Sequence, residues 1–292
     1  MNAPQAHLVG VVFAKGHGAE NDFIVLPDPA GHLLLSREDV IRLCDRRTGI
    51  GADGLLRAVP CAADPEAAAM ADEAEWFMDY RNADGSRGAM CGNGIRVMAR
   101  CLVDAGLCTP GTFAVATRAG VRQVHVPFGR GPADAVSVQM GRPRLPGSQG
   151  IEVSVERRRW PALHVDMGNP HAVVLIDDLA HVGDLREAPA VTPPTEYPAG
   201  VTVEFVTVRG PRHLALRVHE RGVGETRACG TGACAAVAAL RHRRRQTGAA
   251  VYTIDVPGGR LHVAVRADGS MELNGPAVIV ARGTVDLVHA VR

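Results

Sequence analysis

The sequence contains Cys91-Gly92-Asn93-Gly94 in its first half and Cys229-Gly230-Thr231-Gly232 in its second, two turns of the same form. Apolar residues with helical spacing follow each turn, which predicts helices over residues 93–105 and 231–245. A motif repeated in this way indicates two halves of related structure.

The chain around the two turns is dominated by strand patterns. Apolar and β-branched runs predict strands over residues 8–13, 23–26, 54–59, 113–117, 136–140, 173–176, 201–208, 214–218, 251–256 and 261–265. One further helix is predicted over residues 37–46, capped by Ser36. Strands therefore outnumber helices, which indicates an α+β fold. Pro- and Gly-rich stretches at 128–133 and 141–150 place a boundary just before the middle, and 292 residues favour two domains.

The overall charge argues for a small-molecule partner. Basic and acidic side chains nearly cancel to a net charge of +1, so no general field would gather nucleic acid or an anionic membrane. No stretch reaches the roughly 18 apolar residues that span a bilayer. The N-terminus lacks the basic start and cleavage site of a signal peptide, so we expect a cytoplasmic protein.

Lysine and cysteine usage indicates catalysis without a cofactor or metal. Lys15 is the only lysine among 32 basic residues, and it stands in neither a Walker-A motif nor a context that indicates a Schiff base. The seven cysteines form no Cys-x-x-Cys pair, so we expect no zinc site. We expect five of them to pack as small apolar residues: Cys44, Cys61, Cys101, Cys108 and Cys234.

Cys91 and Cys229 stand where a glycine-rich turn enters a helix. The free N–H groups of a first helical turn bind anions, and the positive end of the helix dipole favours a thiolate. Asn93 and Thr231 can cap the helices or donate hydrogen bonds. If the halves face each other, the two turns can hold a carboxylate and place one sulfur on each side of an α-carbon. That arrangement predicts inversion of the α-carbon by two thiols.

Longer motifs make the sequence resemble the diaminopimelate epimerase family, whose fold is shared with proline racemase. These motifs are Lys15 to Phe23, Arg46 to Leu55, Arg81 to Gly94, Met167 to His171 and Glu220 to Gly232. The resemblance implies a pyridoxal-independent isomerase that interconverts LL- and meso-diaminopimelate for lysine and peptidoglycan precursor biosynthesis. It also implies a homodimer, since family members are often dimers.

The resemblance further implies two pseudo-symmetric lobes, each a mixed β-sheet rolled around a central helix, with the active site in the cleft between them. Residues 1–128 would form the N-terminal lobe, to which a C-terminal strand at 278–292 returns. Residues 129–277 would form the C-terminal lobe.

Site residues follow from the same motifs. Cys91 and Cys229 would be the acid and base, supported by His171 and Glu220. Backbone N–H groups of Gly92, Asn93, Gly230 and Thr231 would hold the α-carboxylate. Asn21, Asn82, Asn169, Thr202, Glu220 and Arg221 would bind the rest of the substrate, with Arg221 clamping the distal carboxylate. Three of the chain's residues depart from the common family pattern: Thr202 replaces Asn, Gly54 replaces Gln and Glu20 replaces Gly.

Simpler interpretations remain for single residues and for the whole. Asn82 and Asn169 can be turn residues, His171 a structural histidine, and Glu220 with Arg221 a surface ion pair. The chain can also be a proline or hydroxyproline racemase of the same fold, or a non-catalytic carboxylate-binding protein. A Rossmann interpretation of the glycines at 49–54 fails, because the predicted helix precedes them and the predicted strand follows.

Overall fold

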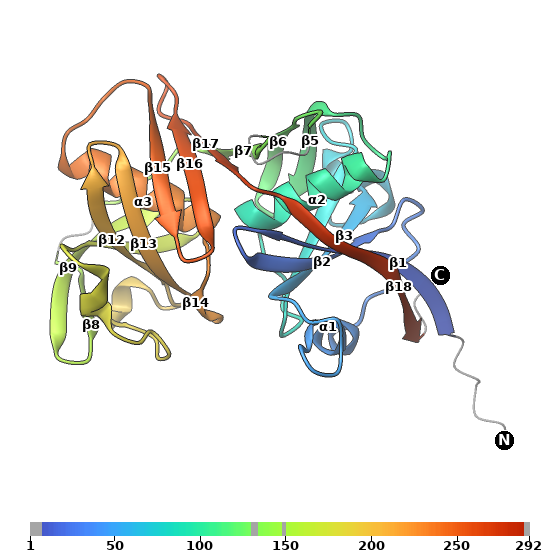
Figure 1. The fold of residues 1–292 in the computed structure, drawn as a ribbon, viewed down its shortest axis with the longest axis horizontal. Coiled ribbons are helices and arrows are strands. Elements are labelled where there is room, and N and C mark those ends of the chain that lie inside the picture. The colour runs from blue at the N-terminus through green and yellow to red at the C-terminus, as the bar shows by residue number, and fades with distance from the viewer. Residues whose placement is uncertain (1–7, 130–133, 148–149, 289–292) are drawn as a thin grey trace. The chain divides into compact units, whose positions relative to one another are not determined.

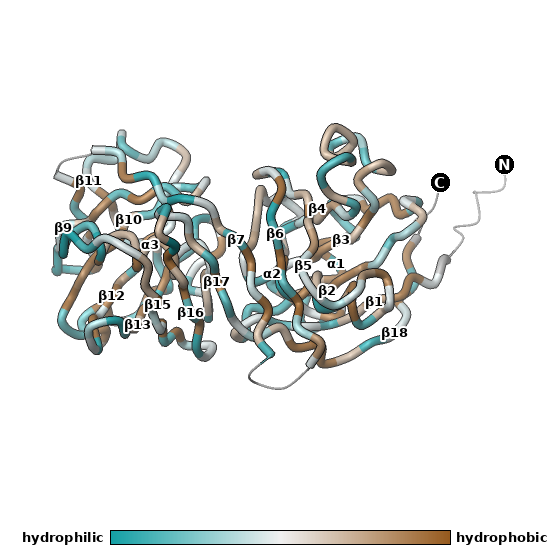
Figure 2. Tube along the Cα trace, turned by 90° about the horizontal axis from the view of Figure 1, so that it is seen from above, coloured by the Kyte–Doolittle hydropathy of each residue, from teal (hydrophilic) through white to brown (hydrophobic). Residues whose placement is uncertain are grey.

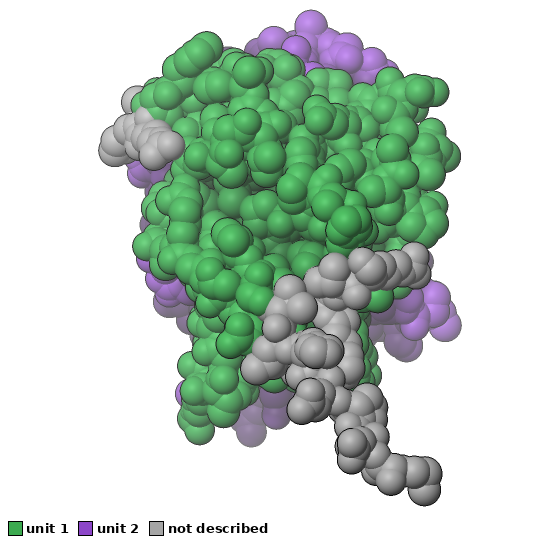
Figure 3. Space-filling view, turned by 90° about the vertical axis from the view of Figure 1, so that its right-hand side faces the viewer, with its two compact units in different colours: residues 1–18, 22–136, 276–292 green, residues 19–21, 137–275 purple. Residues whose placement is uncertain are grey.

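The computed structural model describes residues 8–129, 134–147 and 150–288, which form two compact units (Figure 3). Unit 1 comprises residues 1–18, 22–136 and 276–292, and unit 2 comprises residues 19–21 and 137–275. Four segments that the sequence interpretation uses lie wholly or partly outside the described residues: the N-terminal segment 1–7, the loop 128–133, the stretch 141–150 and the end of the strand expected over 278–292.

Unit 1 contains two helices, α1 (Arg37–Cys44) and α2 (Gly92–Asp104) (Figure 1). Its strands are β1 (Leu8–Gly18), β2 (Asn21–Pro27), β3 (Gly54–Pro60), β4 (Trp76–Asn82), β5 (Gly111–Thr117), β6 (Gly120–Val126) and β18 (Val278–Val288). The last strand, β18, pairs antiparallel with the first, β1. Short 3-10 turns follow β3 at Cys61–Ala63 and Ala68–Met70.

Unit 2 contains one long helix, α3 (Gly230–Arg243), and 3-10 turns at Leu179–Val182 and Pro194–Glu196. Its strands are β7 (Val136–Gly141), β8 (Glu152–Val155), β9 (Arg158–Asp166), β10 (Pro170–Leu175), β11 (Ala190–Thr192), β12 (Thr202–Gly210), β13 (His213–Glu220), β14 (Gly224–Thr226), β15 (Ala250–Val256), β16 (Gly259–Val265) and β17 (Met271–Gly275). The chain is therefore α+β, as its residue pattern predicts.

The two units pair their strands in the same order. In unit 1, β2–β3 is parallel, β3–β4 antiparallel, β4–β5 parallel and β5–β6 antiparallel. In unit 2, β10–β12 is parallel, β12–β13 antiparallel, β13–β15 parallel and β15–β16 antiparallel. The long helix enters at the same point of each series, before β5 and before β15. The repeat in the sequence thus corresponds to a repeat in topology.

Each long helix is buried on every side over its first eleven residues, Gly92 to Leu102 in α2 and Gly230 to Leu240 in α3. Such a helix must be enclosed by its own unit rather than lie on its surface. Strands β1, β3, β4, β6 and β18 contact α2, whereas α3 contacts strands of unit 2. Figure 2 shows apolar residues along the strands of both units, and many of these residues are buried.

The predicted helices are confirmed. The structure begins α2 and α3 one residue earlier than the pattern indicates, and Ser36 caps α1 through the N–H of Asp39 at 3.0 Å. Helix α1 precedes the glycines at 49–54 and β3 follows them, opposite to a dinucleotide-binding motif. Lys15, the single lysine, is held by Asp22 at 2.5 Å and by the carbonyl oxygen of Gly51.

Candidate active site

Both long helices are capped by a cysteine. Cys91 has extended backbone angles, and its sulfur accepts a hydrogen bond from the N–H of Gly94 at 3.3 Å. Cys229 does the same with Gly232 at 3.4 Å. Asn93 and Thr231, which the sequence offers as caps, are instead inside the helices. Each sulfur therefore sits at the positive end of a helix, where backbone N–H groups stabilise negative charge.

In unit 1 a buried arginine supports the turn at Cys91. The guanidinium of Arg96 is fully buried and donates to the carbonyl oxygen of Gly92 at 3.0 Å and to Oδ1 of Asn93 at 2.9 Å. These bonds hold the first turn of α2 and bring a positive charge close to it. The side chain of Asn93 is thus used inside the protein, as an acceptor for Arg96.

In unit 2 the sulfur of Cys229 is surrounded by polar groups. The residue is 5% exposed, and Oγ1 of Thr231 lies 3.4 Å from its Sγ. Burial raises the pKa of Cys229 well above that of a free thiol, and the nearby carboxyls of Glu220 and Glu204 act in the same direction. Bonds from Thr231 and Gly232 only partly oppose this. The helix terminus alone therefore does not make Cys229 a thiolate.

Glu220 lies beside this thiol at the end of β13. Its Oε1 accepts a hydrogen bond from Oγ1 of Thr226 at 2.5 Å. Burial raises the pKa of Glu220, while hydrogen bonds from Thr226 and from the Cys229 thiol lower it. The carboxyl thus lies within hydrogen-bonding reach of the Cys229 thiol. Glu220 is half-buried, and its carboxyl contacts Thr226 and the Cys229 thiol. These contacts differ from those of the surface ion pair with Arg221 that the simpler interpretation describes.

His171 lies at the start of β10 and is fully buried. Its Nδ1 is 2.6 Å from Oε1 of Glu204, which is also fully buried. Burial raises the pKa of Glu204, and the contact with His171 opposes that rise. Sequence reasoning missed Glu204. Its signal is a carboxylate inside the apolar run 201–208, because such a side chain needs a buried partner.

Thr202 and Arg221 meet at the edge of this region. Oγ1 of Thr202 accepts a hydrogen bond from the backbone N–H of Arg221 at 3.4 Å. The side chain of Arg221 lies over Gly200 and donates to the carbonyl oxygen of Ala199 at 3.3 Å. Arg221 also lines a cavity of about 280 Å³ that includes Tyr197 and His219. Arg221 is an exposed residue, so it is accessible to a ligand.

The three predicted asparagines differ in their surroundings. Asn82 is engaged within its own turn, since its Oδ1 accepts from Tyr80 at 2.6 Å and its Nδ2 donates to Ser86 at 2.9 Å. Asn21 is buried at the start of β2. Asn169 is half-buried in the turn before β10, where its carbonyl oxygen accepts from Met167 at 3.1 Å.

Two departures from the family pattern have local explanations. A Cβ at Gly54 would lie 2.7 Å from the carbonyl oxygen of Arg81 and 2.9 Å from the ring of Tyr80, so this chain has no room for a longer residue there. Glu20 has a φ of 61°, a conformation that favours glycine, and it pairs with Arg227 at 2.6 Å.

The structure thus gathers His171, Glu220, Cys229 and Thr231 in unit 2, and Cys91, Gly92 and Asn93 in unit 1. Sequence reasoning missed Glu204 in the first group and Arg96 in the second. Arg96 has its own signal, a charged residue among the apolar positions of a helix that the sequence predicts to be central.

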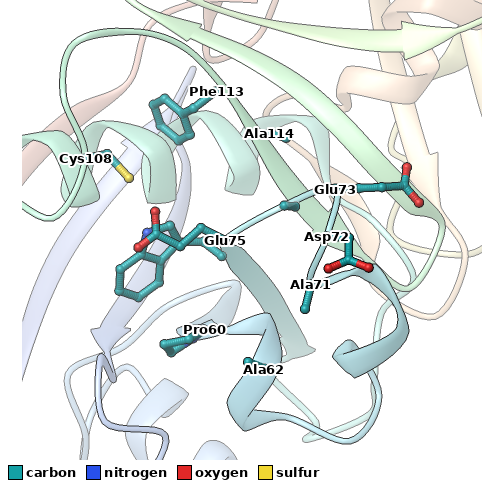
Figure 4. A pocket seen from close by; sticks show the side chains of 11 residues that line it. Pro60, Ala62, Ala71, Asp72, Glu73, Glu75, Cys108, Phe113 and Ala114 are labelled. Carbon is teal, nitrogen blue, oxygen red and sulfur yellow. The ribbon is translucent and has the colours of Figure 1, made fainter.

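A cavity of about 390 Å³ in unit 1 lies elsewhere (Figure 4). It is lined by Cys108, Phe113, Glu75 and neighbouring residues, and within the described part of the chain no predicted site residue contributes to it. Burial raises the pKa of the Cys108 thiol to about 11.

Comparison with known proteins identifies close relatives. A family model described as Diaminopimelate epimerase matches residues 13–146 and 163–288. The diaminopimelate epimerase of Streptomyces coelicolor is 56% identical over 281 residues, covering 94% of this chain and 96% of that protein. The diaminopimelate epimerase of Mycolicibacterium paratuberculosis is 46% identical over 288 residues, covering 94% and 96%. The crystal structure of a hydroxyproline epimerase from Agrobacterium vitis has the same fold, with a TM-score of 0.66, 16% identity and coverage of 96% and 93%.

Among residues 8–129, 134–147 and 150–288, no helix has the length and apolar character needed to cross a membrane.

Proposed function

We propose that this chain, which belongs to the diaminopimelate epimerase family, inverts an α-carbon of diaminopimelate by proton transfer through the thiols of Cys91 and Cys229. The activity itself, that of an isomerase in lysine biosynthesis, follows from relatives at 46% and 56% identity over nearly the whole chain. The hydroxyproline epimerase shares the fold at only 16% identity, so it does not support the proline racemase alternative.

One observation carries the two-thiol mechanism. Each unit encloses a helix that begins at a cysteine, and in each the sulfur accepts the N–H of the glycine three residues later. One thiolate removes the α-proton from one side, and the other thiol delivers a proton to the opposite side. The mechanism requires the two sulfurs to reach opposite faces of one α-carbon, which implies two lobes with the substrate between them.

The surroundings of Cys229 favour its protonated form before reaction. Its pKa is raised by burial and by Glu220 and Glu204, so Cys229 is the proton donor and Cys91 the base in the first half of the cycle. In the reverse direction Cys229 must lose its proton, and Glu220 is placed to receive it. Because one of the two thiols, Cys91 or Cys229, must be ionised and the other protonated, the two titrate as a coupled pair. This predicts a bell-shaped dependence of the rate on pH.

The first turns of α2 and α3 would bind the α-carboxylate. Gly92, Asn93, Gly230 and Thr231 lie in the first turns of α2 and α3, and the N–H groups of a first helical turn have no acceptor within the helix. These groups also stabilise the charge that builds on the carboxylate as the carbanion forms. Arg221 is exposed and suited to clamp the distal carboxylate, with Thr202, Asn21, Asn82 and Asn169 binding the remaining polar groups.

The same family membership leads us to propose a cytoplasmic homodimer. Light scattering of the purified protein tests the dimer, since a mass near the 30.8 kDa of one chain would exclude it.

Substitution of each thiol tests the mechanism. We expect Cys91→Ser and Cys229→Ser each to lower kcat for epimerisation by about 100-fold or more, because inversion needs an acid and a base together. Cys108→Ser is the matched control and should retain wild-type kcat, since Cys108 lines the separate cavity of unit 1. Wild-type activity in either of the first two variants would exclude the two-thiol mechanism.

A further inference from the structure

Glu204 is a carboxyl group enclosed by the interior of unit 2. It stands on β12 between Val203 and Phe205, both of which pack in an apolar cluster, and its side chain is fully buried. A carboxyl in such a place is costly to bury and persists only when it does something that an apolar residue cannot.

Glu204 contacts two parts of the site. Its Oε1 is 2.6 Å from Nδ1 of His171 on the neighbouring strand β10. The same oxygen would be 2.6 Å from a Cβ placed at Gly232, so the carboxyl lies against the first turn of α3. The N–H of Gly232 is the group that donates to the sulfur of Cys229. Glu204 therefore contacts both His171 and the first turn of α3, which begins at Cys229.

The contact with Glu204 determines which ring nitrogen of His171 is engaged and which remains for another partner. With Nδ1 engaged, the ring cannot flip, and Nε2 is its remaining polar atom. Within the described residues, Nε2 of His171 and Oε2 of Glu204 are buried and have no hydrogen-bond partner. Native interiors rarely leave such atoms unsatisfied without a functional reason.

The other ionisable groups near Glu204 come from three directions. They are Glu220 at the end of β13, Cys229 at the start of α3, and Tyr197 in the segment before β12. Glu204 raises the pKa of all three. These three groups therefore share one buried environment with Glu204.

We infer that Glu204 is a positioning residue for the epimerase reaction: it fixes His171 through Nδ1 and packs against Gly232, so that Nε2 is presented at a set place beside the Cys229 turn. This inference rests on the proposed function, because it assigns His171 and Cys229 to the same reaction. Glu204 acts through these two residues and does not touch substrate.

Two variants of Glu204 separate its hydrogen bond from its bulk. Glu204→Leu removes the bond at similar size, whereas Glu204→Gln keeps an oxygen that can accept from Nδ1. We expect kcat to fall about 10- to 100-fold in Glu204→Leu, as when a group that orients a site histidine is removed elsewhere, with KM within about threefold of wild type. Glu204→Gln should recover most of this loss.

A second histidine–carboxylate pair supplies the control. His213 and Asp255 also lie 2.6 Å apart in unit 2, but their side chains are 38% and 36% exposed. Asp255→Leu removes the same kind of bond outside the site, as Glu204→Leu does within it, and should leave kcat and the pH profile unchanged. Thermal melts show that each variant is folded before its kinetics are read.

Nitrogen NMR of protein with labelled histidine measures the tautomer of the His171 ring, which reports its positioning independently of activity. We expect a single tautomer for His171 in the wild type and in Glu204→Gln, and averaged ring-nitrogen shifts in Glu204→Leu, with the signal assigned by its loss in His171→Gln. Wild-type kcat in Glu204→Leu, a loss confined to KM, equal losses in both Glu204 variants, or an unchanged His171 tautomer would overturn the inference. A wild-type protein that shows the single tautomer but no epimerisation would instead contradict the proposed function.

Discussion

The N–H of Gly232 donates a hydrogen bond to the sulfur of Cys229 over 3.4 Å, and a Cβ at position 232 would force Glu204 to shift. The closest atom to a Cβ there is Oε1 of Glu204 at 2.6 Å. Gly94 makes the same bond to Cys91 at 3.3 Å, but a Cβ there first meets Cδ2 of Leu56 at 3.2 Å. The same hydrogen bond from glycine N–H to cysteine sulfur thus occurs in each turn. The turns differ in how tightly other atoms pack around the Cα of the glycine, which is more crowded at Gly232 than at Gly94.

This difference predicts unequal effects of alanine. Gly232→Ala should lower the free energy of unfolding by about 1 to 3 kcal/mol, as overpacking usually does, and should reduce kcat by displacing Glu204 and the Cys229 turn. Gly94→Ala should change the unfolding free energy by less than about 1 kcal/mol, because Leu56 can shift and alanine favours the helix. Urea unfolding and epimerase assays measure both, and equal effects of the two substitutions would contradict the packing described.

The raised pKa of Cys229 predicts a loss of stability in alkali. The folded protein binds this proton more tightly than the unfolded chain, in which cysteine titrates near pH ~8.5. The contribution is therefore complete below pH ~8.5 and is lost as pH rises above it. In Cys229→Ala the unfolding free energy should fall less steeply between pH 8.5 and 10.5, by up to about 1.4 kcal/mol per pH unit. Identical slopes for variant and wild type would show that Cys229 titrates normally.

Arg96 predicts a link between stability and activity in unit 1. In Arg96→Met the carbonyl oxygen of Gly92 and Oδ1 of Asn93 lose their buried donor, which should cost about 2 to 5 kcal/mol of unfolding free energy. The turn at Cys91 should loosen, so kcat should fall as well. Arg100 lies one turn further along α2 and donates to the carbonyl oxygen of Pro127 at 2.7 Å, away from Cys91. Arg100→Met should therefore destabilise the protein but retain kcat, and a similar loss of kcat in both would remove the special role of Arg96.

The backbone conformation and ion pair of Glu20 predict that the substitution Glu20→Gly has little effect on stability. Its left-handed backbone costs about 1 to 2 kcal/mol, and its ion pair with Arg227 is more than half exposed, so it contributes at most about 1 kcal/mol. Glu20→Gly should leave the unfolding free energy within about 1 kcal/mol of wild type, whereas Glu20→Val should lower it. A loss above about 2 kcal/mol in the glycine variant would show that the ion pair contributes more than surface pairs usually do.

Much of the fold follows from local pattern. The helices could be predicted because a glycine-rich turn and an apolar stripe are both local signals, and Ser36 caps α1 by bonds within three residues. Strand β4 was missed because it carries Asp79 and Arg81 in an otherwise apolar segment. Asp79 is buried and Arg81 is half-buried, and ion pairs hold both, including one between Asp79 and Arg118 from a distant part of the chain. Their polarity therefore conceals the strand.

Some site residues could likewise be predicted from local sequence, whereas others depend on contacts between distant parts of the chain. The two cysteines and the residues around them could be predicted because the motifs are contiguous in sequence. The pair of His171 and Glu204 could not, because 33 residues separate them and only the parallel pairing of β10 with β12 brings them together. The raised pKa of Cys229 could not be predicted either, since the helix terminus favours thiolate and only the buried carboxyls reverse that preference.

Proton transfer between opposite faces is tested most directly in heavy water. LL-diaminopimelate is incubated with the reduced wild-type protein in D₂O, and early samples are analysed for stereochemistry and α-deuterium in both substrate and product. Two thiols predict meso product that carries one α-deuterium from the first turnovers, while the remaining LL substrate is still protiated. Absence of conversion, or deuterium entering the LL substrate as fast as the meso product forms, would contradict the account.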